Sequence, residues 1–210
     1  MSFEASLIEE LRRAHGVHTV ILYGSRSRGE ATPESDIDVA CYAEVADSTR
    51  DARLWNDMYL DASVHPTARL GQAPGADTLK LSGGLVLLDE HGLARAYLDR
   101  IAALEEQGPP PLSDAERRMR RVWIRKTLAR IRRDDLEAHY RHHWLLYHLL
   151  EDYFVLRGEW YRGPKRALAD LLSYSPDTFV AFERALKPGA PLAATEALAE
   201  IVLGEGAGTE

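Results

Sequence analysis

Cysteine is almost absent from this chain of 210 residues, in which Cys41 is the only one. A single cysteine cannot form an internal disulfide, and it excludes a zinc site built from several cysteines. Long apolar runs are also missing, since no stretch approaches the roughly 20 residues that cross a membrane. The N-terminus lacks a basic segment followed by an apolar one, so no secretory signal is expected. These absences favour a cytoplasmic protein.

Basic residues are outnumbered, with 26 Lys and Arg against 33 Asp and Glu, which gives a net charge of −7. Proteins devoted to nucleic acids usually present basic surfaces to the anionic phosphate backbone. The acidic balance therefore argues weakly against a nucleic-acid partner, because a local patch can differ from the total. An apolar fraction of 45% is ordinary for a globular protein, and the length allows one large domain or two small ones.

The residues that carry chemistry gather in residues 20–40. The apolar run 20–23 predicts a buried strand, and Gly24 and Ser25 follow it where a helix would begin. Free backbone N–H groups and a hydroxyl at such a junction can bind a phosphate. Asp36 and Asp38 lie two apart in a second predicted strand, so both carboxylates share one face. Paired carboxylates repel each other unless a cation lies between them, which predicts a divalent-metal site beside the phosphate loop.

Asp61 adds a third acid to this group. It lies between apolar neighbours in a third predicted strand, residues 58–66, which ends at a proline. A carboxylate buried in a central strand is costly unless it is paired or bound to metal. A structural role is the usual explanation for an isolated example, but the neighbouring acid pair makes metal binding the preferred interpretation here.

The other elements predicted before residue 108 surround these strands. Apolar positions at helical spacing predict a covering helix over residues 2–14, and a first strand spans 17–23. Residues 47–57 are interpreted as a helix packed on the sheet. Turn-forming residues at 67–78 predict a loop. A further strand at 84–88 and a helix ending near residue 104 complete this part.

A stiff Gly-Pro-Pro-Pro segment at 108–111 predicts a linker. Beyond it the pattern is all-helical, beginning with a capping box at Ser113 and Glu116. A break is expected at 132–135, a helix end at Gly158, and helix starts near Pro164, Pro176 and Pro191. We therefore expect an α+β protein with a small mixed-sheet domain at 1–108, a helical bundle at 112–203, a cleft between them and a flexible tail at 204–210.

Gly24-Ser25, Gly29, the stretch Ser35-Asp36-Ile37-Asp38-Val39 and the later Asp61 resemble the signature of the nucleotidyltransferase superfamily that includes DNA polymerase β. The layout is similar to that of small bacterial aminoglycoside and lincosamide nucleotidyltransferases. The resemblance is specific over residues 17–65. Over 112–203 it rests on the helical layout and on the segment 160–165.

The resemblance implies transfer of a nucleoside monophosphate, AMP by preference, from ATP or another nucleoside triphosphate to an acceptor hydroxyl. Asp36, Asp38 and Asp61 would bind two Mg²⁺ ions, and in some family members the acid at the position of Asp61 deprotonates the acceptor instead. Gly24 and Ser25 would hold the triphosphate. Arg28 would add positive charge there, as would Arg26, although solvated loop arginines are an equal alternative.

The predicted bundle contributes further candidates. Glu151 and Asp152 interrupt an apolar segment, and Glu151 is chosen as an alternative general base. Lys165 follows a helix-starting proline and is a candidate ligand of the triphosphate, with a plain surface lysine as the alternative. His139, His142, His143 and His148 are interpreted as bundle packing, because no third metal ligand is identifiable beside them.

Three hypotheses remain open from the sequence. The first is an enzyme that acts on a small hydroxylated acceptor, such as an aminoglycoside-like antibiotic, whose positive charge suits an acidic protein. The second is a protein-modifying or toxin–antitoxin nucleotidyltransferase with a hydroxyl on a partner protein as acceptor. The third is a binding protein with a decayed site, against which the intact motifs argue. A membrane partner is not expected, and a homodimer stays open.

Overall fold

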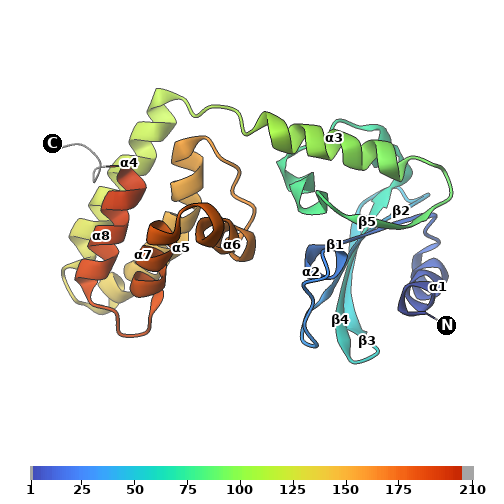
Figure 1. The fold of residues 1–210 in the computed structure, drawn as a ribbon, viewed down its shortest axis with the longest axis horizontal. Helices are drawn as coiled ribbons and strands as arrows, with labels where there is room; N and C mark the ends of the chain where they lie inside the picture. Colours follow the sequence, from blue (N-terminus) through green and yellow to red (C-terminus); the bar gives the residue numbers. More distant parts are fainter. Residues whose placement is uncertain (1, 205–210) are drawn as a thin grey trace. The chain divides into compact units, whose positions relative to one another are not determined.

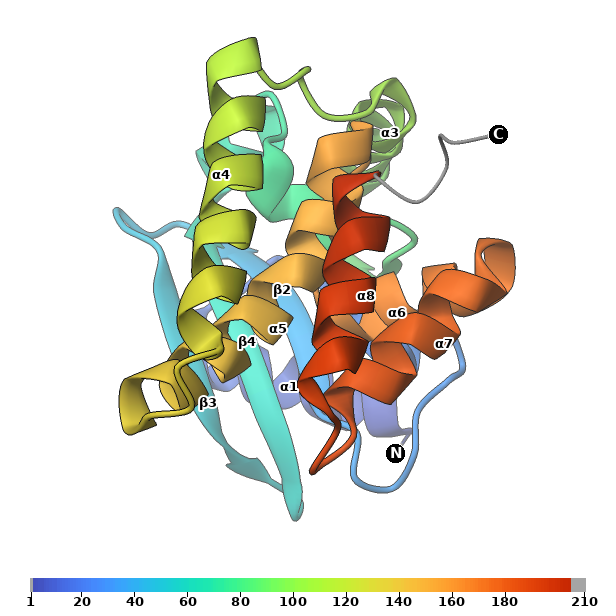
Figure 2. The same ribbon diagram turned by 90° about the vertical axis from the view of Figure 1, so that its left-hand side faces the viewer.

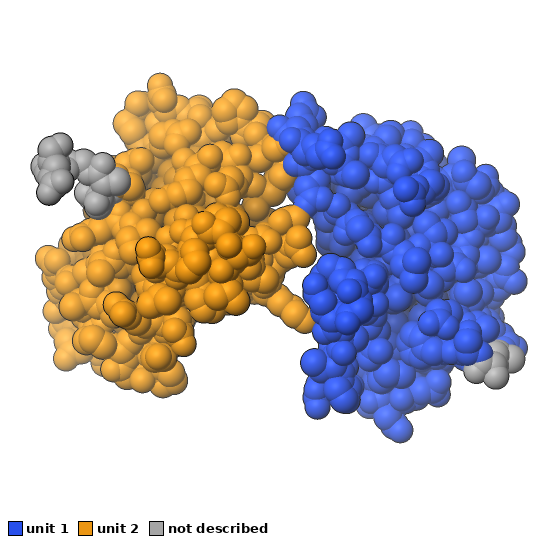
Figure 3. Space-filling view, in the orientation of Figure 1, with its two compact units in different colours: residues 1–107 blue, residues 108–210 orange. Residues whose placement is uncertain are grey.

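The structure, a computed structural model, describes residues 2–204 and divides the chain into two compact units, Met1–Gln107 and Gly108–Glu210 (Figure 3). Apart from Gly204, which caps the last helix, the predicted tail lies outside the described residues. Over the described range no helix has both the length and the apolar content needed to cross a membrane. The predicted α+β class, a mixed sheet followed by helices, is confirmed.

Unit 1 is built on a five-stranded sheet with the order β3-β4-β2-β1-β5 (Figure 1, Figure 2). Strands β2 and β4 run parallel, and the other neighbours are antiparallel. The strands are β1 (Thr19–Tyr23), β2 (Ile37–Ala43), β3 (Thr49–Trp55), β4 (Met58–Pro66) and β5 (Leu85–Asp89). Because β2 is central and buried, its first residues place the predicted acids at one end of the sheet.

Helices cover both faces of this sheet. Helix α1 (Phe3–His15) begins at the cap Ser2 and buries Leu7 and Leu11 against one face. On the other face, α3 (Ala94–Gln107) packs with two short 3₁₀ helices, η1 (Thr67–Gly71) and η2 (Ala76–Leu81). These 3₁₀ turns replace the single loop predicted at 67–78. Side chains alternate along a strand, so Asp38 shares the α3 face with Ala40 and Tyr42.

The helix predicted at 47–57 is wrong, because this segment is β3, which pairs with β4 as a hairpin. The two residues of the turn, Asn56 and Asp57, both have positive φ, at 49° and 64°. Asn and Asp are the side chains that tolerate this conformation best after glycine, and a two-residue turn with positive φ at both positions suits a hairpin. From Asp51 to Leu54, charged and apolar residues alternate at a strand's period of two, which a helical interpretation overlooks.

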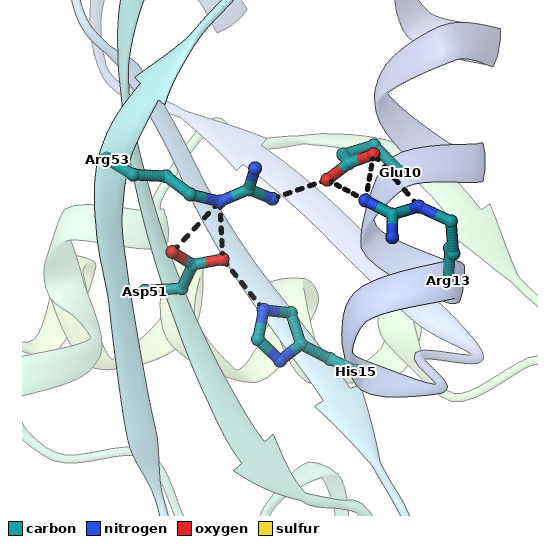
Figure 4. Close-up of polar contacts among 5 residues, drawn as sticks. All are labelled: Glu10, Arg13, His15, Asp51 and Arg53. Carbon is teal, nitrogen blue, oxygen red and sulfur yellow. Dashed lines mark hydrogen bonds and ion pairs between the residues drawn. The ribbon is translucent and has the colours of Figure 1, made fainter.

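An ion-pair network joins α1 to β3 (Figure 4). Arg53 donates to Glu10 at 2.8 Å and to Asp51 at 3.0 Å, and Asp51 Oδ2 lies 2.8 Å from His15 Nε2. Arg13 completes the network by pairing with Glu10. Burial works to raise the pKa of Asp51, but the contacts with His15 and Arg53 outweigh it and lower that pKa. The network ties the edge strand to the helix.

Unit 2 is an all-helical bundle. Its helices are α4 (Asp114–Ile131), α5 (Leu136–Arg157), α6 (Pro164–Tyr174), α7 (Pro176–Leu186) and α8 (Leu192–Leu203). The predicted capping box is confirmed, with Ser113 and Glu116 exchanging hydrogen bonds. The predicted break is confirmed between Ile131 and the cap Asp135, as is the end of α5 at Gly158. Apolar side chains of α5, including Leu145 and Leu149, form the centre of the core.

Candidate active site

Asp38 and Asp61 are brought side by side by the sheet. They are directly paired in the register of the parallel strands β2 and β4, although they are far apart in the sequence. Neighbouring strands lie about 4.8 Å apart, and residues paired in this way point to the same face. Both side chains are half-buried. Two carboxylates at this spacing can share one divalent cation or hold one each.

Asp36 is placed differently from the prediction. Strand β2 begins at Ile37, so Asp36 lies in the turn before the strand and is exposed. The pleat of the strand therefore does not fix its side chain on the face of Asp38 as the period of two predicted. Its backbone carbonyl accepts a hydrogen bond from Arg26 Nε at 3.0 Å. The contribution of Asp36 to metal binding stays a prediction.

Gly24 packs against the acid pair. It follows β1 and has a φ of 76°, and a Cβ at this position would lie 2.5 Å from Oδ2 of Asp38. Glycine is thus needed on two counts, the left-handed backbone and the close approach of the carboxylate. The sequence motif predicts that the missing side chain of Gly24 leaves space for a phosphate. In the structure the same missing side chain makes room for Asp38.

Ser25 lies in α2 (Gly24–Ser27), a single helical turn that follows β1. Its side chain is buried, and its carbonyl accepts a hydrogen bond from the Glu30 backbone N–H at 2.9 Å. These contacts hold the turn that carries Gly24 close to Asp38. Triphosphate binding by Ser25 stays a prediction.

The two loop arginines have different partners. Arg26 donates to the carbonyls of Ser35 and Asp36 and so ties α2 to the segment that enters β2. Arg28 pairs with Glu30 at 2.8 Å. The structure therefore gives Arg26 a clear architectural role. Arg28 keeps a partly exposed side chain in an ion pair, and its binding to triphosphate stays a prediction.

Arg50 is a site residue that the sequence interpretation missed. It lies on β3, and its guanidinium donates to both carboxylate oxygens of Asp61, with Nε 2.7 Å from Oδ1 and Nη2 2.5 Å from Oδ2. The fork geometry of arginine matches a carboxylate in this way. A helix over residues 47–57 would not place Arg50 beside Asp61. The Asn56-Asp57 pair is the signal for the hairpin turn that does so.

Tyr23 and Lys80 also escaped the sequence interpretation. Tyr23 pairs with Asp38 in the register of β1 and β2, and burial, with the charges of Asp38 and Asp61 behind it, raises the pKa of its phenol. The hydroxyl therefore stays protonated and can donate a hydrogen bond. Lys80 Nζ, from η2, lies 5.2 Å from the centre of the Tyr23 ring. Arg50 thus contacts the acid pair and Lys80 lies beside the ring of Tyr23, and both come from elements that show no motif.

The candidates in unit 2 form a separate group. Arg120 contacts both acids of α5, with Nη2 3.4 Å from Glu151 Oε1 and Nη1 2.5 Å from Asp152 Oδ1. Asp152 is buried, and burial raises its pKa even with Arg120 beside it. This makes Asp152 a structural partner of Arg120 and leaves Glu151 as the more exposed acid. Lys165 is exposed at the start of α6, next to Pro164.

The histidines of α5 have packing and hydrogen-bonding partners within unit 2. His148 contacts the rings of Trp123 and Trp144 edge-on. His142 Nε2 lies 2.7 Å from the hydroxyl of Thr195, and burial lowers its pKa. His139 pairs with Asp134 at 2.9 Å. His143 stacks beside His142, with 6.2 Å between ring centres.

One comparison with known proteins bears on the residues of this site. Residues 5–67 match the family model described as a nucleotidyltransferase domain, a range that includes Gly24, Asp36, Asp38, Asp61 and Arg50. No curated protein matches the chain. A solved structure of a nucleotidyltransferase-like protein from Exiguobacterium sibiricum is similar at 15% identity and a TM-score of 0.40, covering 97% of this chain and 74% of that one. Residues 5–67 thus match a nucleotidyltransferase domain, the kind of domain whose signature the Gly-Ser and Asp-x-Asp motifs resemble.

Proposed function

We propose that this enzyme moves a nucleoside monophosphate, AMP from ATP, to a hydroxyl of a small acceptor in a Mg²⁺-dependent reaction that releases pyrophosphate. The observation that carries this proposal is the pairing of Asp38 with Asp61 beside the backbone of Gly24. Two carboxylates on one sheet face, next to a turn that begins with a glycine, suit a bound triphosphate and its metal ions.

The donor set fits Mg²⁺, which prefers carboxylate oxygens to nitrogen or sulfur. Asp38 and Asp61 would supply these oxygens, with Asp36 reaching in from the turn before β2. When bound, the metal offsets the negative charge of the triphosphate and of the transition state. Asp61 already pairs with Arg50, so binding there requires this guanidinium to share or release the carboxylate.

The reaction transfers one group and balances without a further reactant. An acceptor oxygen forms a bond to the α-phosphorus, the bond from that phosphorus to the bridging oxygen breaks, and pyrophosphate leaves with the electron pair. The hydroxyl proton goes to a carboxylate, and the proposed bases are Asp61 and, from α5, Glu151. Ser25, Arg28 and Lys165 are proposed to hold phosphate oxygens, and Lys80 and the Tyr23 hydroxyl are further donors near the acid pair.

The proposed acceptor is a cationic polyhydroxylated molecule such as an aminoglycoside-like antibiotic. The net charge of −7 supports this choice, because a negative protein potential attracts a cationic acceptor and raises its rate of encounter. The same charge disfavours an anionic acceptor. An antibiotic-resistance role follows from the proposal if the acceptor is an antibiotic.

A transfer assay tests the proposal. The full chain is incubated with ATP labelled at the α-phosphate, Mg²⁺ and a panel of aminoglycosides, lincosamides and candidate proteins. We expect label on one small acceptor and equimolar pyrophosphate. In Asp38→Asn, transfer should fall by at least about a thousandfold, because one of the paired metal ligands is lost, while circular dichroism stays that of the wild type.

Asp47→Asn is the matched control, since Asp47 is an exposed acid of the same unit outside the acid pair. Label on a protein in place of a small molecule would favour the protein-modifying alternative. Absence of any labelled acceptor together with absence of triphosphate binding would overturn catalysis altogether. A nearly wild-type rate in Asp38→Asn would overturn the metal assignment.

A further inference from the structure

A second cluster of possible metal ligands lies at the other end of the sheet in unit 1. His18 precedes β1, Glu44 follows β2, and His91 follows β5. Thr19 pairs with Tyr42 and with Asp89, so the ends of the three strands beside His18, Glu44 and His91 lie together at one end of the sheet. The acid pair lies beside Tyr23, which is five residues after His18, or about 16 Å away at the rise of a strand. The cluster is therefore separate from the candidate active site.

The three side chains lie close together. The nearest ligand atoms of His18, Glu44 and His91 all lie within 4.8 Å of one another. Nε2 of His18 is 3.9 Å from Oε1 of Glu44, and the two imidazole rings stack with their centres 4.0 Å apart. Among the described residues this is the one group of at least three His, Cys, Asp or Glu side chains that meets this distance.

The cluster combines one buried histidine with two exposed side chains. His18 is buried, and its ring nitrogens lie 2.9 Å from the Thr19 hydroxyl and 2.7 Å from the Thr67 hydroxyl. Glu44 and His91 are exposed. A tetrahedral zinc site with bonds of roughly 2.0–2.1 Å places its ligand atoms about 3.3 Å apart. Rotation of the two exposed side chains toward His18 closes the remaining distance.

Three acidic side chains lie around the cluster, although burial and the neighbouring His91 lower the pKa of His18. Glu44, Glu90 and Asp89 all place negative charge near the His18 ring. Arg12 pairs with Glu90 and offsets part of that charge. Two neutral imidazoles and one carboxylate leave a bound divalent ion with a net charge of one, which Asp89 and Glu90 help to balance.

We propose that His18, Glu44 and His91 form a binding site for a divalent transition metal, with Zn²⁺ as the best match. Two imidazole nitrogens and one carboxylate oxygen suit Zn²⁺, whereas Mg²⁺ selects oxygen ligands alone. The Thr67 hydroxyl, 2.6 Å from Glu44 Oε1, lies in position to support a fourth ligand such as water. The bound ion links the ends of β1, β2 and β5 and stabilises unit 1. It takes no part in nucleotidyl transfer.

A Zn²⁺ titration of the full chain tests the site. The protein is stripped with a chelator, and the background is Asp38→Asn with Asp61→Asn, so that the acid pair contributes no second metal site. Calorimetry should give one Zn²⁺ per chain, and Co²⁺ in its place should give the visible absorption of a low-symmetry site with nitrogen ligands. His91→Ala and Glu44→Gln should each weaken Zn²⁺ binding by at least about tenfold.

The matched control is His139→Ala with His143→Ala, which removes the exposed histidines of α5 and should leave Zn²⁺ affinity unchanged. Zinc should also raise the unfolding temperature of the background protein by a few degrees and fail to do so in His91→Ala. If the α5 variant lost Zn²⁺ binding and His91→Ala kept it, the proposal would be overturned. The absence of stoichiometric binding in the background protein would also overturn it. All these readouts are independent of transferase activity.

Discussion

The carboxylate of Asp38 occupies the space beside Gly24 that a side chain would need, since a Cβ on Gly24 would lie 2.5 Å from Oδ2 of Asp38. The loop glycine of the motif and the acid proposed to bind metal are therefore in direct contact. A change at either position moves the other. This link between two parts of the sequence motif leads to the first prediction.

Gly24→Ala should reduce kcat/KM by about a hundredfold, because a displacement of about 1 Å in a catalytic group can cost that much. The added methyl group forces the Asp38 carboxylate away from its position. The left-handed backbone at 76° adds about 1–2 kcal/mol of strain. Transfer kinetics and urea unfolding measure the two effects separately.

Gly29→Ala is the matched control for strain alone. Gly29 has a similar φ of 72°, but no atom lies within 4 Å of the position of its Cβ. This variant should lose comparable stability and keep its Mg²⁺ dependence. Equal losses of activity in the two variants would show that backbone strain, and not the contact with Asp38, is responsible.

Arg50→Gln should lower the Mg²⁺ concentration at half-maximal rate by about two- to fivefold, the effect expected of an exposed ion pair. Arg50 occupies both oxygens of Asp61, so its removal frees this carboxylate for metal. The rate is measured over a Mg²⁺ series at saturating ATP. Arg53→Gln, on the same strand but facing α1, should leave the Mg²⁺ dependence unchanged. A rise in the KM for ATP without a change in Mg²⁺ dependence would instead assign Arg50 to the triphosphate.

Glu151→Gln separates the two proposed bases. If Glu151 accepts the acceptor proton, kcat should fall by about 10²–10⁴, the usual contribution of a general base, with the Mg²⁺ dependence unchanged. Asp61→Asn should instead change both kcat and the Mg²⁺ dependence. Glu137→Gln is the control, because Glu137 is an exposed acid on the same helix that pairs with Arg141. Wild-type kinetics in Glu151→Gln would leave Asp61 as the base.

Asp51→Asn should destabilise unit 1 by about 1 kcal/mol at pH 7, because a neutral amide makes weaker hydrogen bonds with His15 and Arg53 than the carboxylate does. The pKa of Asp51 is lowered in the folded protein. Its stabilisation is therefore complete above the unfolded value, near 3.8, and is lost as the pH falls through the folded pKa. Urea unfolding, followed by hydrogen-exchange protection of β2–β4 peptides, measures the difference at each pH.

Asp47→Asn is the control for this pH series, since it removes an exposed acid from the turn before β3. Its stability should follow that of the wild type throughout. A difference between Asp51→Asn and the wild type that persists unchanged below the folded pKa of Asp51 would contradict the proposed origin of the stabilisation.

Local signals in the sequence were sufficient for most elements. The capping box at Ser113, the break before Asp135 and the end of α5 at Gly158 depend on backbone groups within a few residues, and all three predictions are confirmed. Strand β3 was predicted wrongly because its charged residues fit a helix as well as an edge strand. Only the pairing with β4 decides between them, and that pairing is a tertiary contact.

The sequence by itself determined the chemistry, because Gly24-Ser25 and Asp36-x-Asp38 are short-range patterns whose meaning comes from strand and turn geometry. The tertiary structure decided which side chains meet. Parallel register placed Asp61 beside Asp38, the hairpin brought Arg50 onto Asp61, and the ends of three strands gathered His18, Glu44 and His91. The physical reason is that sheet pairing joins residues across any length of chain, whereas helix caps and turns are fixed by their immediate neighbours.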